Sequence, residues 1–72
     1  MPGMVCVKYN GVSYCLNLET NKFEIFMHTQ VDTKDCPIEV VCDLLALAGK
    51  EVSTEKMQEL FAAVGKEVSV GK

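Results

Sequence analysis

Residues 4–16 read MVCVKYNGVSYCL, two alternating segments on either side of Asn10-Gly11. This dipeptide readily adopts the two positive φ angles of a type I′ turn, the tight connection that is typical of a β-hairpin. A two-residue loop also fixes the register of the two strands, and it places Cys6 directly opposite Cys15. The stretch therefore predicts a hairpin on which the rest of the sheet is built.

A third strand is predicted to follow, completing an antiparallel β-meander over residues 4–28. The connection at residues 19–22 is rich in turn-forming residues. As a four-residue loop it would place Leu16 opposite Ile25. Alternation then gives the sheet one apolar face, the expected core side, formed by Val5, Val7, Tyr9, Val12, Tyr14, Leu16, Phe23, Ile25 and Met27. Residues 29–35 are polar apart from one valine and are expected to form a crossing loop.

The first of two predicted helices begins near Cys36. This residue precedes Pro37, which disfavours helical angles in the residue before it. We therefore expect Cys36 to be the N-cap, Pro37 the first helical residue and Gly49 the stop. Apolar side chains cover most of the circumference of this helix, so burial on more than one side is predicted, with Leu45 in the middle.

The second helix is predicted to start after an N-cap at Ser53 and to end at Gly65, so that a helical hairpin spans residues 37–65. Its apolar stripe consists of Met57, Leu60, Phe61 and Val64. Residues 66–72 form a tail that could add a short C-terminal strand. The chain is thus predicted to be one α+β domain, residues 1–72, with a three-stranded antiparallel β-meander followed by a two-helix hairpin.

Charge and composition restrict the partners of this domain. The 72 residues include 10 acidic and 7 basic side chains, a net charge of −3, and every basic residue is lysine. Nucleic-acid recognition relies on clustered positive charge and on arginine, so no nucleic-acid partner is expected. The longest apolar run, residues 44–48, is far shorter than the roughly 20 residues that span a bilayer, and the first residues lack the basic start of a secretory signal. We expect a cytoplasmic protein without a membrane partner.

Four cysteines carry the most reactive chemistry in the chain: Cys6, Cys15, Cys36 and Cys42. Their spacing lacks the paired motifs of zinc sites, so neither a metal nor a cofactor is predicted. Without a signal for an oxidising compartment, Cys6 and Cys15 are expected to be reduced. Cys36 is predicted to be the most reactive thiol, because a helix N-terminus favours the thiolate. The one histidine, His28, lies across a loop from it, and no catalytic residue is assigned.

The second face of the predicted sheet carries apolar residues that contact with water alone would not require. The inferred registers place Cys6, Cys15 and Phe26 in one row, with Met4 nearby and polar residues around them. Contiguous apolar area with a polar rim marks interfaces. A domain of this length buries only about 60% of the surface of its unfolded chain, so covering this face would enlarge a small core. We predict an interface here, with Phe26 as its anchor.

Two functions remain open from the sequence. The leading one is a small acidic non-enzymatic protein-interaction module, a regulator or adaptor that forms a homodimer or binds another protein. The alternative is a thiol-redox or metal-binding protein that uses Cys36 or the Cys6/Cys15 pair. Native mass with and without reductant, together with a metal assay, separates the two.

Overall fold

The computed structural model describes residues 3–25 and 29–70, and residues 66–70 through their backbone alone. Its elements are β1 (Met4–Tyr9), β2 (Val12–Asn17), β3 (Lys22–Ile25), β4 (Thr29–Val31), a 3-10 turn (Thr33–Asp35), α1 (Ile38–Glu51) and α2 (Thr54–Val70). The four strands form one sheet in the order β1-β2-β3-β4, and each pair of neighbours is antiparallel. The predicted α+β class is therefore confirmed, with one strand more than expected.

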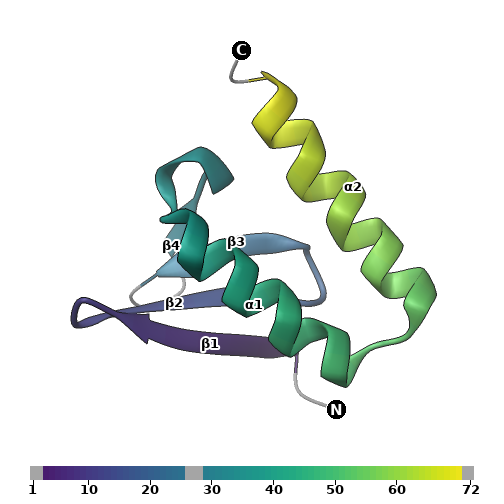
Figure 1. Cartoon of the computed structure of the whole chain (residues 1–72), viewed down its shortest axis with the longest axis horizontal. Coiled ribbons are helices and arrows are strands. Elements are labelled where there is room, and N and C mark those ends of the chain that lie inside the picture. Colours follow the sequence, from purple (N-terminus) through teal and green to yellow (C-terminus); the bar gives the residue numbers. More distant parts are fainter. Residues whose placement is uncertain (1–2, 26–28, 71–72) are drawn as a thin grey trace.

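Helix α1 lies across one face of the sheet, where it packs against β1 and β2 (Figure 1). Helix α2 runs beside this layer and contacts α1 and the 3-10 turn. Nine buried apolar residues form the core: Leu16, Leu18, Phe23, Cys36, Val40, Val41, Leu44, Ala48 and Leu60. They come from β2, its following turn, β3, the link between the 3-10 turn and α1, and both helices, so the core joins α1 and α2 to one face of the sheet.

The first hairpin forms as predicted. Asn10 and Gly11 adopt φ angles of 51° and 80°, which are the left-handed values that a type I′ turn needs. The resulting register sets Cys6 opposite Cys15. Local turn chemistry thus positions two cysteines that lie far from the turn itself.

Replacing Gly11 by alanine should destabilise the fold by about 1 to 2 kcal/mol, because a Cβ atom disfavours left-handed angles. Steric contact would not contribute, since no atom lies within 4 Å of the Cβ position. The matched change Gly65→Ala, in the interior of α2, should instead stabilise by about 0.5 to 1 kcal/mol. Urea unfolding of both variants checks the opposite signs, and a stabilising effect of Gly11→Ala would contradict the assigned turn.

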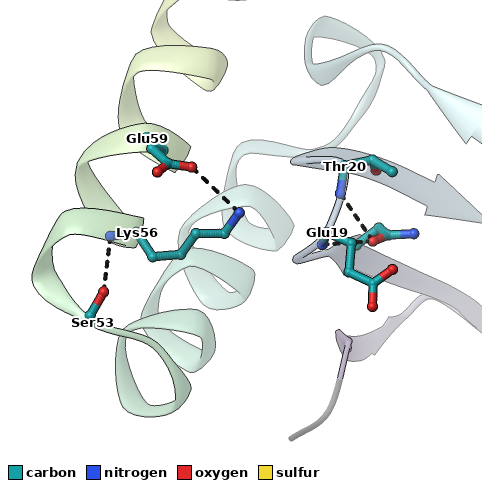
Figure 2. Close-up of polar contacts among 6 residues, drawn as sticks. Glu19, Thr20, Ser53, Lys56 and Glu59 are labelled. Carbon is teal, nitrogen blue, oxygen red and sulfur yellow. Dashed lines mark hydrogen bonds and ion pairs between the residues drawn. The ribbon is translucent and has the colours of Figure 1, made fainter.

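The second connection begins earlier than predicted. Leu16 pairs with Phe23, not with Ile25, so the four-residue loop consists of residues 18–21. The reason is the side chain of Asn17, whose Oδ1 accepts hydrogen bonds from the backbone N–H groups of Glu19 (2.9 Å) and Thr20 (3.2 Å) (Figure 2). These bonds begin the turn directly after Asn17. The observed register of the second and third strands differs from the predicted one by two residues. Side chains alternate between the two faces of a sheet, so every side chain keeps its predicted face.

The segment at residues 29–31 is a strand and not the crossing loop that was expected. It forms β4, in which Val31 pairs with Phe23 and Thr29 pairs with Ile25. The polar composition of this segment hid its role, because only Val31 contributes to the core face. The predicted core residue Met27 lies outside the described residues.

Helix α1 differs from the prediction at both ends. Its N-cap is Pro37, and Cys36 is extended (φ −95°, ψ 139°), so the expectation that Cys36 caps this helix is wrong. The helix also continues through Gly49 to Glu51. It stops because Val52 turns extended, with its N–H still bonded to the helix, so no left-handed glycine is needed.

Helix α2 begins as predicted and ends later. The Oγ of Ser53 accepts a hydrogen bond from the N–H of Lys56 at 3.2 Å, and the Nζ of Lys56 lies 3.6 Å from Glu59 (Figure 2). Ser53 therefore satisfies a free N–H of the first turn. The helix continues through Gly65 to Val70, so the predicted stop at Gly65 and the optional strand in the tail are wrong.

Candidate functional site

The centre of the candidate site is a disulfide between Cys6 on β1 and Cys15 on β2. The two residues lie directly opposite each other, with their Cα atoms 4.0 Å apart, at a position where the strands exchange no hydrogen bonds. The expectation that both thiols are reduced is therefore wrong for this structure. The Cys6 side is exposed, whereas Cys15 is half-buried.

The disulfide belongs to a row of side chains across the second face of the sheet. Cys15 pairs with Glu24 on β3, and Glu24 pairs with Gln30 on β4. The prediction that Phe26 stands beside Cys15 is wrong, because the earlier start of the second loop moves Glu24 into that place. Phe26 itself lies outside the described residues. A carboxylate, not an aromatic ring, is the neighbour of the disulfide.

The side chain of Glu24 is ionisable, yet it is buried and held in position. Its side chain is only 5% exposed, and its Oε2 accepts a hydrogen bond of 3.2 Å from the Nδ2 of Asn17. Asn17 therefore has two roles: its Nδ2 binds Glu24, and its Oδ1 accepts the hydrogen bonds that begin the second turn. A buried carboxylate needs such partners, since losing contact with water is unfavourable for a charge. The sequence analysis placed Glu24 only among the polar residues around the apolar row, and the observed strand register puts it directly beside Cys15.

Met4, the remaining predicted interface residue, also lies on the second sheet face, opposite Asn17 at the end of β1. It is half-buried. Helix α1 packs on the other face, so Met4 and the Cys6–Cys15 disulfide share a surface that α1 does not cover. Their role in an interface stays a prediction.

Cys36 has a different environment from the one predicted. It belongs to the hydrophobic core, with 8% of its surface exposed, and its Sγ donates a hydrogen bond of 3.7 Å to the backbone carbonyl of Asp32. A buried thiol in apolar surroundings is normally inert. The other free cysteine, Cys42, is exposed on α1 and is the free thiol that solvent reaches.

Among the side chains that the structure describes, two large apolar ones are exposed. Phe61 on α2 is 56% exposed and Ile38 at the start of α1 is 71% exposed. The sequence analysis placed Phe61 in the apolar stripe of the second helix, and Ile38 is one of the apolar residues that were expected to cover most of the circumference of the first. A signal was available for Phe61, because adjacent helical residues point about 100° apart, and Leu60 and Phe61 can both be buried only if two sides of the helix are covered.

A polar contact joins the first hairpin to α1. The hydroxyl of Tyr9 donates a hydrogen bond of 3.1 Å to Oε1 of Glu39. This bond, and then the negative charge of Glu39, raise the pKa of Tyr9 above its ordinary value. The folded chain therefore holds the phenolic proton more tightly than the unfolded chain does. Its stabilising effect is present below the ordinary tyrosine pKa and is lost as the pH rises through the folded pKa.

Removing the charge with Glu39→Gln should lower the pKa of Tyr9 toward its ordinary value. The pKa can be followed by NMR of tyrosine ring carbons in a Tyr14→Phe background, which leaves one tyrosine signal. The matched change Asp43→Asn, on the exposed side of the same helix, should leave that pKa where it is. An unchanged Tyr9 pKa in Glu39→Gln would contradict the assigned cause.

The described parts of the chain contain neither a group of residues suited to a metal ion nor a helix suited to spanning a membrane. Among residues 3–25 and 29–70, no three Cys, His, Asp or Glu side chains gather into a group that could hold a metal ion. His28 lies outside these residues. Within the same ranges, no helix combines the length and the apolar character that crossing a membrane requires.

Comparison of the chain with models of protein families, with curated proteins and with solved structures finds no match. The function must therefore be inferred from the residues and their geometry.

Proposed function

We propose that this chain is a small acidic protein-interaction module without enzymatic activity, a regulator or adaptor that self-associates. The observation that carries the proposal is the exposure of Phe61. Its neighbour Leu60 is fully buried, yet Phe61 is 56% exposed in the same apolar stripe of α2. Met57 and Val64 of that stripe are only half-buried.

The energetics support a contact at this position. Burying a side chain such as phenylalanine is worth about 1.5 to 3 kcal/mol. Large aromatic side chains are frequent anchors of protein interfaces, because they supply much area with few rotatable bonds. The described core of the domain has nine buried apolar residues, so a second copy that covers α2 would add substantially to it.

The second sheet face is the other surface open to such a contact. Met4 and the Cys6–Cys15 disulfide contribute its apolar part. Exposed Lys8 and Lys22 lie on the same face, as does the carboxylate of Glu24, and charged groups are depleted from the centres of interfaces. The stripe on α2 is therefore the more favourable of the two surfaces.

Sedimentation velocity over a range of concentrations tests the proposal. We expect the wild type to form a dimer, and Phe61→Glu to shift it to a folded monomer. The matched control is Ala62→Glu, which adds the same charge at the next exposed position of α2 and should keep the dimer. Circular dichroism checks that each variant is folded.

Three outcomes decide between the possibilities. A wild type that stays monomeric at every concentration would contradict self-association. A monomer produced by Met4→Glu but not by Phe61→Glu would retain the function and move the contact to the sheet. Equal dissociation by Phe61→Glu and Ala62→Glu would mean that added charge, not the phenyl ring, controls the oligomeric state.

A further inference from the structure

The disulfide stands in a row whose two ends differ. Cys6 is on β1, which is an edge strand because it pairs with β2 alone in the sheet. Cys15 is on the interior strand β2, and Glu24 follows it in the same row on β3. The row therefore reads, from the sheet edge inward, Cys6, Cys15, Glu24.

We propose that the Cys6–Cys15 disulfide is a site of covalent exchange with external thiols, and that the incoming thiolate attacks the Sγ of Cys6 and not that of Cys15. Displacement at a disulfide proceeds in line, with the nucleophile on the extension of the bond between the two sulfurs. Cys6 is exposed and lies on the edge strand β1, so a nucleophile can approach its Sγ from beyond the sheet. Cys15 is half-buried on the interior strand β2, and Glu24 on β3 is its neighbour on the side away from Cys6.

Charge acts in the same direction as access. Glu24 is the cross-strand neighbour of Cys15, and its side chain is nearly fully buried and accepts a hydrogen bond from Asn17. Negative charge on this carboxylate would oppose a thiolate that approaches Cys15 from the side of β3. Exchange rates depend on which sulfur is attacked and on access to it. Both effects favour Cys6.

The reaction balances with two external thiols. The first thiolate forms a mixed disulfide with the sulfur of Cys6, and Cys15 leaves as a thiolate that takes a proton from solvent. A second thiolate then attacks the sulfur of the external thiol, which forms an external disulfide and releases Cys6 as a thiolate. Two external thiols are oxidised by two electrons in total, and the protein disulfide is reduced to two thiols.

No other thiol of the described chain is placed to resolve the mixed disulfide, so the second thiol must come from another molecule. Cys36 is buried in the core and Cys42 is on α1, and α1 packs against the opposite face of the sheet. The reactant class is therefore a small monothiol such as glutathione, or a dithiol that supplies both groups. The turn at Asn10-Gly11 and the backbone pairing of β1 with β2 also hold the two cysteines opposite each other, so we expect reduction to be reversible.

The test uses the oxidised full chain with Cys42→Ser, which removes the exposed free thiol, and reduced glutathione as the probe. Samples are quenched with acid, free thiols are alkylated with N-ethylmaleimide, and peptides are mapped by mass spectrometry. We expect glutathione on Cys6 and maleimide on Cys15. The Cys6 adduct should exceed the Cys15 adduct by about tenfold, the ratio that a barrier difference of ~1.4 kcal/mol produces.

Variants of Glu24 test the cause of this selectivity. Glu24→Gln keeps the size and removes the charge, and Glu24→Ala also opens the approach, so the ratio should fall in the first and fall further in the second. The matched control Glu19→Gln removes an exposed carboxylate from the second loop and should leave the ratio unchanged. A ratio that does not change in either Glu24 variant would overturn the role of this residue.

A second measurement covers the case of a mixed disulfide too short-lived to map. Cys15→Ser and Cys6→Ser each leave one thiol of the pair, and each folded variant is reacted with glutathione disulfide. The thiol of Cys6 should be modified about tenfold faster than that of Cys15. Equal rates, a faster Cys15, or a wild-type disulfide that resists both glutathione and dithiothreitol would overturn the proposal.

Discussion

Replacing Leu44 by alanine will destabilise the fold by about 2 to 5 kcal/mol, because the smaller side chain leaves a cavity in a packed interior. Leu44 lies in the middle of α1 and has no exposed surface. Domains have total stabilities of about 5 to 15 kcal/mol, and a short chain lies toward the lower end. We therefore expect the Leu44→Ala variant to be largely unfolded at moderate temperature.

Leu45→Ala is the matched control for this prediction. The sequence analysis placed Leu45 at the centre of the buried stretch, but the structure shows it only half-buried and gives the central position to Leu44. The same chemical change at Leu45 should therefore have a smaller effect. Urea unfolding followed by circular dichroism compares the two variants, and a larger loss at Leu45 would show that α1 is rotated from its described orientation.

Replacing Phe23 by alanine will cost about 3 to 5 kcal/mol of folding stability. Phe23 is on the interior strand β3, is 2% exposed, and pairs with Leu16 on one side and Val31 on the other. Losing its ring removes contacts with both neighbouring strands. Thermal unfolding should show a large decrease in Tm or no cooperative transition.

Phe61→Ala makes the same change, from phenylalanine to alanine, at an exposed position and is the control for Phe23→Ala. Because Phe61 is 56% exposed, removing its ring should lower the stability of the monomer by no more than about 1 kcal/mol, well below the loss expected for Phe23→Ala. Calorimetry should be performed below the concentration at which any dimer forms, so that folding and association are separated. A loss as large as that of Phe23→Ala would place Phe61 in the core and remove the basis for its role in binding.

The parts of the fold that depend on local chemistry could be predicted from the sequence. Asn10-Gly11 allows few alternatives for the backbone, and the register of the first hairpin follows from it, including the pairing of Cys6 with Cys15. Ser53 similarly marks the start of α2. In each case a few adjacent residues determine the conformation without help from the rest of the chain.

The parts that failed depend on tertiary contacts. The second turn is set by both ends of the Asn17 side chain, one of which binds Glu24 on a neighbouring strand. Gly49 and Gly65 permit a helix stop, but neither requires one, and both helices continue past them. The sequence also does not determine whether the facing thiols of Cys6 and Cys15 are oxidised to a disulfide. The cytoplasmic location and the absence of a nucleic-acid partner stay predictions.

The sequential order of the four strands has a consequence for how fast the chain folds. Every strand in this sheet pairs with its neighbour in sequence, so each pairing closes only a short loop, and the entropy lost in closing it is small. Proteins rich in such local contacts reach their folded state quickly. We expect the main refolding phase to take about milliseconds by stopped-flow measurement. The docking of α1 onto β1, the strand farthest from it in sequence, would then be the slowest event and would set the observed rate.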